Sequence, residues 1–211
     1  MLRARTLFRI FESLLIISII FNFFSCGKKY IPEQEKYIKS IEEFRHEKNE
    51  EMKNDPSSPF NQDKNAHFKP LKYFDVNPDF VFKSKLYKYD KQDSVIIFGT
   101  KGEKRKILRF GYVLINFKNK QYKLNVYRGS SPNGAVYYTI WFTDKTTGDE
   151  TYGVGRYLDF DLNPDTSYVY TIDFNLAYNP YCAYSAKYSC AIPSKEDHVD
   201  LAIKAGEKNF H

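Results

Sequence analysis

The stretch GDETYGVGRYLDF, residues 148–160, holds the densest group of side chains that could do chemistry. Its glycines Gly153 and Gly155 stand two residues apart, as at the start of the dinucleotide-binding motif G-x-G-x-x-G. The third glycine is missing, because that position is Leu158, and the residues that follow alternate like a strand rather than a helix. No Gly-Lys-Ser/Thr sequence occurs in the chain, so a Walker-type phosphate loop is excluded as well. We therefore expect Gly148 to lie in a turn, and Gly153 and Gly155 to permit a bulge or the close approach of another segment.

The charged side chains beside the glycines leave two interpretations open. Arg156 carries a planar, permanently charged guanidinium, which suits a carboxylate or a phosphate. Its plainest partner is an internal acid, Asp159, Asp161 or Asp173, and the ion pair is then structural. Alternatively, Arg156 and the nearby Tyr152 lie at the mouth of a binding site.

Two cysteines follow a predicted strand in the stretch DFNLAYNPYCAYSAKYSC, residues 173–190. In an exported protein we expect a disulfide between Cys182 and Cys190. A metal site is a more specific alternative, because Cys182, Cys190 and His198 are equally spaced in the sequence and Glu196 lies nearby. Zinc usually takes closely paired ligands, and this spacing is not a known one. Buried, unpaired thiols are the third possibility.

The sequence gives weaker support for other catalytic groupings of residues. The chain has none of the motifs H-E-x-x-H, G-x-S-x-G or D-x-D-x-D-G. A nucleophilic pair of Cys182 with His67 has only residue type in its favour. Asp159 and Asp173 could act as acid and base across neighbouring strands, although strand aspartates next to turns are more often caps or ion pairs. We expect neither a cofactor nor a metal, and the sequence leaves open whether the protein is an enzyme.

Composition and charge limit the class of protein. The chain has 211 residues with 18 Tyr and 18 Phe, a content of rings that excludes disorder over its whole length. Its net charge is +6, of which about +2 falls in residues 1–25. The remaining charge is spread among many acids, which does not favour a nucleic-acid partner. We expect none.

The first residues predict an N-terminal export signal. Three arginines precede the apolar run SLLIISIIFNFFS, which is shorter than the roughly 20 residues that span a bilayer. This pattern is typical of a signal peptide, here residues 1–25. The stretch FFSC resembles a bacterial lipoprotein box, so we expect Cys26 to be acylated and residues 26–34 to form a lipidated tether. The protein would then be held in the cell envelope on a bacterial membrane, facing the periplasm. An uncleaved anchor helix is the alternative.

Residues 35–54 predict an amphipathic helix. Tyr37, Ile41 and Phe44 recur at helical spacing on one side, and the other side is rich in Glu and Lys. The stretch NDPSSPF ends the helix, because proline cannot continue it.

After the helix the hydrophobic period becomes two, which indicates strands joined by short turns. We expect one mainly β domain, residues 55–211, whose antiparallel sheet is curled into a barrel or a sandwich. Residues 175–211 are rich in turn formers and are expected to wrap over one end. With the helix, this gives a single globular domain over residues 35–211.

The motifs TTGDETYGVGRYLDF and IDFNLAYNPYCAYSAKYSCAIPSKEDHVDLAIKAGE resemble the uncharacterised bacterial family known as domain of unknown function 1684. The resemblance spans roughly Ile31 to Glu207 and implies no established activity. It departs at Ile172, at Leu176 and in the stretch IPSKED. The residues that carry it are Thr147, Gly148, Thr151, Tyr152, Gly155, Arg156, Asp173, Phe174, Asn175, Ala177, Asn179, Pro180, Cys182, Cys190, Pro193, Glu196, Gly206 and Glu207.

These observations lead to one preferred function and two alternatives. We expect a membrane-anchored β domain that binds a small molecule or peptide near TYGVGRYLD and DFNLAYNPYC. The alternatives are a hydrolase-like enzyme using Asp173, Glu196 and Arg156, with or without a metal, and a structural envelope lipoprotein. The candidate ligand-binding residues are Tyr152, Arg156, Asp159, Asp173, Asn175, Asn179 and Glu196.

Overall fold

The computed structural model describes residues 29–131 and 133–211, and the larger compact unit of the chain is Lys36–His211. The predicted signal peptide, Cys26 and the start of the predicted tether lie outside the described residues. Among the residues that are described, no helix combines the length and the apolar character needed to cross a bilayer.

The predicted N-terminal helix is α2, Pro32–Asn54. Acidic residues in its first turn, Glu33 and Glu35, suit the positive end of the helix dipole. The buried side differs from the predicted stripe, because Arg45 is buried while Phe44 is 42% exposed. The guanidinium of Arg45 lies 4.5 Å from the ring centre of Tyr73 and donates to the Phe74 carbonyl at 2.8 Å. These contacts offset part of the cost of burying the guanidinium.

Short helices and strands make up the rest of the chain. The helical segments are α3 (Pro59–Gln62), η1 (Pro78–Phe80), η2 (Phe174–Leu176), η3 (Tyr181–Ala183) and η4 (Lys195–Asp197). The strands are β1 (Val81–Lys85), β2 (Tyr87–Lys88), β3 (Ser94–Phe98), β4 (Lys104–Phe117), β5 (Lys120–Ser130), β6 (Val136–Asp144), β7 (Arg156–Asp159), β8 (Val169–Asp173) and β9 (His198–Val199).

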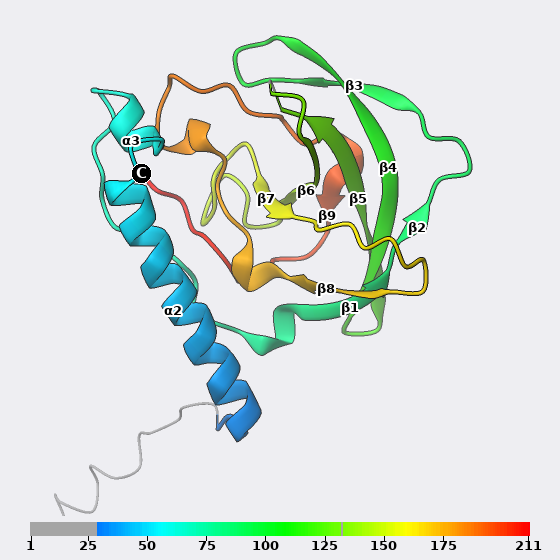
Figure 1. The fold of residues 1–211 in the computed structure, drawn as a ribbon. Coiled ribbons are helices and arrows are strands. Elements are labelled where there is room, and N and C mark those ends of the chain that lie inside the picture. The colour runs from blue at the N-terminus through cyan, green and yellow to red at the C-terminus, as the bar shows by residue number, and fades with distance from the viewer. Residues whose placement is uncertain (1–28, 132) are drawn as a thin grey trace, which may run out of the picture. The chain divides into compact units, whose positions relative to one another are not determined.

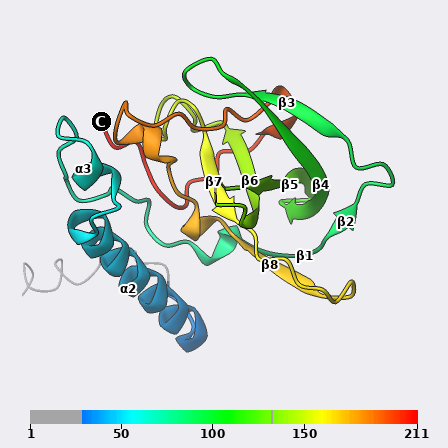
Figure 2. The same ribbon diagram turned by 45° about the horizontal axis from the view of Figure 1, so that its top comes forward.

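Most of these strands belong to one seven-stranded sheet in the order β2-β4-β5-β6-β7, with β3 also paired to β4 and β9 to β6. The pairings are antiparallel except for the short parallel contact of β6 with β9. β1 and β8 form a separate two-stranded sheet, which Figures 1 and 2 show apart from β7. The predicted mainly β, antiparallel fold is confirmed as a curled sheet facing a second small sheet. No pairing between the described strands closes it into a barrel.

The largest apolar core lies between the two sheets. Phe82 of β1 and Ile172 of β8 meet Val113, Val126 and Phe142 of the larger sheet there. Burying these side chains supplies the main drive for folding, at about 1.5–3 kcal/mol for each one fully buried.

The opposite face of the larger sheet is covered as well. Tyr127 and Trp141 stack at 4.9 Å between ring centres and pack with Ala191 from the tail. β6 is therefore buried on both faces at Ile140, Trp141 and Phe142. This is why a simple inward and outward alternation does not describe β6.

The tail crosses the molecule near α2, as Figure 1 shows in red. The Phe74 N–H donates to the Gly206 carbonyl at 3.0 Å, and the Glu207 N–H donates to the Ala177 carbonyl at 2.8 Å. A further apolar cluster joins α2, α3 and the tail through Met52, Phe60 and Phe210. The C-terminal segment is thus an integral layer of the fold.

Candidate ligand-binding site

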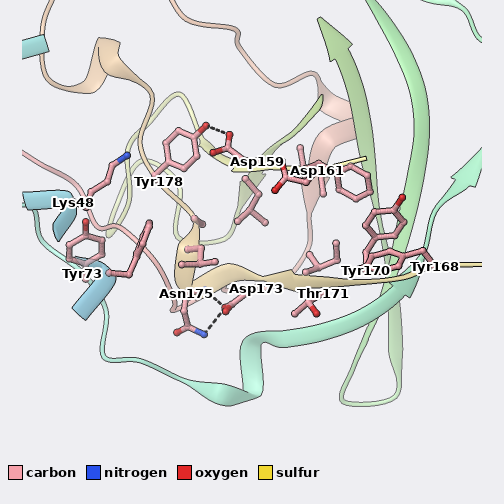
Figure 3. Close-up of a pocket in the computed structure, with 17 residues that line it drawn as sticks. Lys48, Tyr73, Asp159, Asp161, Tyr168, Tyr170, Thr171, Asp173, Asn175 and Tyr178 are labelled. Carbon is pink, nitrogen blue, oxygen red and sulfur yellow. Dashed lines mark hydrogen bonds between the residues drawn. The ribbon is translucent and has the colours of Figure 1, made fainter. Parts of the chain in front are cut away.

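A cleft of about 400 Å³ opens where β7 and β8 face each other without pairing. Its floor is apolar and consists of core side chains such as Ile140, Leu158 and Ile172. Its rim is polar and aromatic, as Figure 3 shows. The cleft exists because the two sheets share a core but have no ladder of hydrogen bonds along this seam.

Two carboxylates project from the β7 side of this cleft. Asp159 is the last residue of β7, and Asp161 follows two residues later, so that both lie on one side of an extended chain. Both are exposed. The Tyr178 hydroxyl donates to Asp159 Oδ1 at 2.6 Å. Within the described part of the chain, neither carboxylate is in an ion pair. They are therefore free to meet a ligand.

A third carboxylate, Asp173, lies on the β8 side and already has several donors. Its Oδ1 accepts the backbone N–H of Asn175 at 2.9 Å, and its Oδ2 accepts the Tyr37 hydroxyl at 2.7 Å. Burial and the contact with Asp173 raise the pKa of Tyr37, so this hydroxyl remains a donor. Asp173 gives the cleft negative charge while it caps η2.

Asn175 joins three elements beneath the cleft. Its Oδ1 accepts the Asn77 N–H at 2.8 Å, and its Nδ2 donates to the Asn77 carbonyl at 2.9 Å and to the Tyr37 hydroxyl at 3.0 Å. The side chain is 1% exposed. Asn175 therefore positions the neighbouring Asp173 and contributes little surface to a ligand.

Aromatic rings and one cation complete the walls. Lys48 of α2 holds its ammonium 5.4 Å from the ring centre of Tyr178. Tyr170 stacks on Phe160 at 4.5 Å and meets Tyr168 edge to face at 4.8 Å. Burial and Asp159 raise the pKa of Tyr178, which keeps its hydroxyl protonated. These rings offer faces and edges to a ligand that enters the cleft.

Arg156 lies inside the protein and not at the mouth of the cleft. It is 0% exposed. Its guanidinium donates to the Ile203 carbonyl at 2.9 Å, to the Glu207 carbonyl at 3.2 Å and to the Ala205 carbonyl. Its acidic partner is Asp144, at 3.5 Å, and not one of the three acids expected from the sequence. Burial lowers its pKa to about 10, so it is still a cation at neutral pH. These contacts support the interpretation of Arg156 as part of an internal, structural ion pair and not as a ligand-binding residue.

Gly155, which precedes β7, shows why the motif at residues 148–160 needs a glycine at this position. Its φ is +111°, in the region that favours glycine. A Cβ at this position would lie 2.6 Å from the Phe142 carbonyl oxygen. Phe142 is the β6 partner of Arg156, so the glycine lets the chain enter β7 close against β6. The predicted close approach of another segment is confirmed at this position.

The other candidate residues lie elsewhere. Asn179 braces the tail, because its Nδ2 donates to the Lys208 carbonyl at 2.8 Å and its backbone N–H donates to the Glu207 carboxylate. Glu196 is exposed and pairs with Arg109 at 2.5 Å. The Tyr152 hydroxyl donates to the Cys182 carbonyl at 3.2 Å.

The hydrolase alternative named Asp173, Glu196 and Arg156 as a group. Asp173 lies in the cleft, Glu196 in a surface ion pair and Arg156 in the interior, each with its own partners. The structure therefore does not bring this group together. Asp159 and Asp173, the other acid–base pair considered, do line the same cleft.

The disulfide expected between Cys182 and Cys190 is not formed in this structure, where both cysteines are free thiols. The metal alternative also required His198, whose Nδ1 lies 3.1 Å from the Thr143 hydroxyl. In the described ranges, no group of three or more His, Cys, Asp or Glu side chains is arranged to hold a metal ion.

Sequence reasoning thus found Asp159, Asp173 and Asn175 and missed several other residues of the cleft. Asp161 could have been found from its position two residues after Asp159 on an extended segment. Lys48 could have been found from its place four residues after Phe44 on the helix. No local signal marks Tyr168 and Tyr178, because their place in one cleft depends on how the two sheets face each other.

Fold and site define a mainly β protein with an open antiparallel sheet, one long helix and an acidic, aromatic cleft. The chain belongs to the family described as "Protein of unknown function (DUF1684)", whose model matches residues 66–208. This confirms the predicted family. The match carries no information on export or lipidation.

Known structures support the same fold. The chain is similar to the solution NMR structure of the uncharacterized protein from gene locus rrnAC0354 of Haloarcula marismortui. The two are 27% identical with a TM-score of 0.60, over 83% of this chain and 96% of that one. No curated protein matches the chain.

Proposed function

We propose that the unit Lys36–His211 binds a small molecule, or a side chain of a peptide, through a positively charged group in the cleft between β7 and β8. One observation carries this proposal. Asp159 and Asp161 are exposed on the same side of the chain, are in no ion pair within the described residues, and line the same cleft as several aromatic rings.

The balance of charge supports a cationic ligand. The cleft is lined by the carboxylates Asp159, Asp161 and Asp173 and by one ammonium, that of Lys48. It is therefore negative in a chain whose net charge is +6. A cation that enters is attracted to the carboxylates, and this attraction is stronger here than in open solvent because the apolar floor lowers the local dielectric constant.

The rings add a second reason. A cation over the face of a Tyr or Phe ring gains about 0.5–2 kcal/mol, depending on how far it is desolvated. Phe44, Tyr168 and Tyr178 lie at the rim, and Lys48 already makes such a contact with Tyr178. A cavity of about 400 Å³ also lies within the size range of small-molecule sites.

The experiment that tests this function compares three probes of one shape. Phenethylamine, neutral 2-phenylethanol and anionic 3-phenylpropanoate are titrated into the purified chain by calorimetry at pH 7. We expect the amine to bind at least about tenfold more tightly than the alcohol, from one charge-assisted hydrogen bond of about 1.5–3 kcal/mol, and the anion to bind weakest. Equal binding of the three probes, or none, would contradict the proposal.

We further propose that the protein is exported and held on a bacterial membrane by acylated Cys26, which is the sequence-based expectation. The support is the basic, apolar and cysteine-terminated order of residues 1–26. Mass spectrometry of the N-terminal peptide from cell membranes would show a lipid-modified Cys26. A wild-type chain that fractionates with the soluble proteins would contradict it.

A further inference from the structure

A second group of reactive side chains lies in the segment from η3 to Cys190. Cys182 and Cys190 are both free and partly exposed. The backbone N–H of Cys182 donates to Cys190 Sγ at 3.1 Å. The backbone N–H of Cys190 in turn donates to the Thr100 hydroxyl at 3.1 Å, which fixes this end of the segment to the turn after β3. The two thiols are therefore held against each other.

The surroundings of Cys182 stabilise a thiolate. The Cys190 thiol donates to the Cys182 sulfur, the Tyr152 hydroxyl lies 3.7 Å from it, and Thr100 contributes a further hydrogen bond. Together they lower the pKa of Cys182 to about 7 against the opposing effect of burial. The pKa of Cys190 is raised, because Cys190 keeps the proton of this S–H···S bond.

The charged and titratable groups facing the pair come from other elements. Tyr152 precedes β7 and Tyr157 lies in it, and burial raises the pKa of both, so each hydroxyl stays neutral. Arg105 of β4 is a cation that acts on Cys190, and it is paired with Glu103. Among these groups, therefore, no unpaired cation is left to form an ion pair with the Cys182 thiolate. Hydrogen bonds are the main source of its stabilisation.

The pair is also accessible. Cys190 lines a second open cleft, of about 390 Å³, with Arg105, Tyr157, Tyr181 and Tyr188 on its walls. Cys182 is itself partly exposed, and a reagent with a disulfide can approach the pair from the Cys190 side through this opening. A buried structural cysteine pair has no such opening and no stabilised thiolate.

We propose that Cys182 and Cys190 form a thiol–disulfide exchange site that takes a disulfide as its substrate. The Cys182 thiolate attacks one sulfur of the substrate, whose S–S bond breaks and releases the first thiolate product. Cys190 then loses its proton to solvent and attacks the Cys182 sulfur, which releases the second product. The substrate is reduced to two thiols, which take two electrons from the cysteine pair and two protons from solvent, and a Cys182–Cys190 disulfide forms. The site is separate from the cleft between β7 and β8, and the proposal does not depend on ligand binding there.

The test uses the full chain with Cys26→Ser, so that Cys182 and Cys190 are the only thiols. The protein is equilibrated with mixtures of reduced and oxidised glutathione, quenched by alkylation and examined by mass spectrometry. We expect reversible formation of one intramolecular disulfide across these mixtures. Thiols that react only after the chain is unfolded in urea would overturn the proposal.

Three variants assign the roles of the residues, and circular dichroism checks that each is folded. Cys190→Ser should trap glutathione on Cys182, because no second thiol resolves the mixed disulfide. Cys182→Ser should react about tenfold more slowly at pH 7, since the remaining thiol is mostly protonated. Tyr152→Phe should move the pH midpoint of the alkylation rate upward. Equal rates for the two cysteine variants, or thiols freed only by a metal chelator, would contradict the assignment.

Discussion

At the scale of single residues, the charged side chains of the family motifs divide by whether the protein itself satisfies them. Arg156 and Glu207 are fully buried, and backbone and side-chain partners surround both. Asp159 and Asp161 lie in the open cleft, where Tyr178 donates a hydrogen bond to Asp159 and no described side chain is in an ion pair with either. Side chains of the first kind hold the fold together through their hydrogen bonds, and carboxylates of the second kind are exposed to solvent.

Glu207 should make the protein less stable as the pH rises. Burial raises its pKa from 4.5 to about 7, although the N–H of Asn179 and the hydroxyl of Tyr184 lower it in part. Between these pH values the folded state binds a proton that the unfolded state has lost. The stabilisation is complete below this window and is lost as pH rises through it, on the order of 3 kcal/mol in all.

Urea unfolding of the wild type and of Glu207→Gln between pH 4.5 and 8 measures this effect. Glutamine keeps the shape of the side chain, accepts from Asn179 and cannot ionise, so its curve should be flatter over this range. Glu47→Gln, a change on the exposed side of α2, is the control and should keep the wild-type slope. An unchanged slope in Glu207→Gln would show that the carboxyl ionises normally.

At the scale of elements, the C-terminal segment is fixed by charged groups of β6 and β7. Arg156 donates to the Ile203 and Glu207 carbonyls, and Asp144 Oδ2 accepts the Ile203 N–H at 2.7 Å. Gly206 allows the close passage, because a Cβ there would lie 2.6 Å from the Ala177 carbonyl oxygen. The buried pair of Arg156 and Asp144 thus holds the C-terminal segment in place by hydrogen bonds, because this segment has few strand pairings of its own.

The substitution Arg156→Lys tests this fastening. Lysine keeps the charge but lacks the planar fork, so at least one buried carbonyl loses its donor and unfolding should become easier by about 1–3 kcal/mol. Hydrogen exchange should become faster at the Ile203 and Glu207 amides. Binding of phenethylamine should not change. Weaker amine binding at unchanged stability would instead place Arg156 in the binding site.

The elements also show what the sequence could and could not predict. The helix, most strands and the turn at Gly148 follow from local patterns, and residue type and strand position mark Asp159 and Asp173 as a possible pair. The pairing of β1 with β8 was not predictable, because it joins residues such as Phe82 and Ile172 that are far apart in the chain. The same holds for the partner of Arg156, since Asp144 becomes its neighbour only through the register of β6 and β7.

At the scale of the whole molecule, two clefts share one wall. Asp159 and Tyr178 line both the acidic cleft and the second cleft beside Cys190. The Tyr178–Asp159 hydrogen bond therefore separates a site suited to a cation from a pair of thiols. The unit Lys36–His211 carries both proposed sites on a sheet whose described strands do not close into a barrel.

The measurement that tests the central claim most directly is the dissociation constant of phenethylamine for Asp161→Asn. This carboxylate is exposed and bonded to nothing in the described protein, so the change removes one charge and leaves the fold intact. Asp149→Asn removes an exposed carboxylate outside the cleft and is the control. We predict that Asp161→Asn weakens binding about tenfold, corresponding to roughly 1.4 kcal/mol, and that Asp149→Asn does not change it. Equal weakening by both variants, or by neither, would contradict a cation site between β7 and β8.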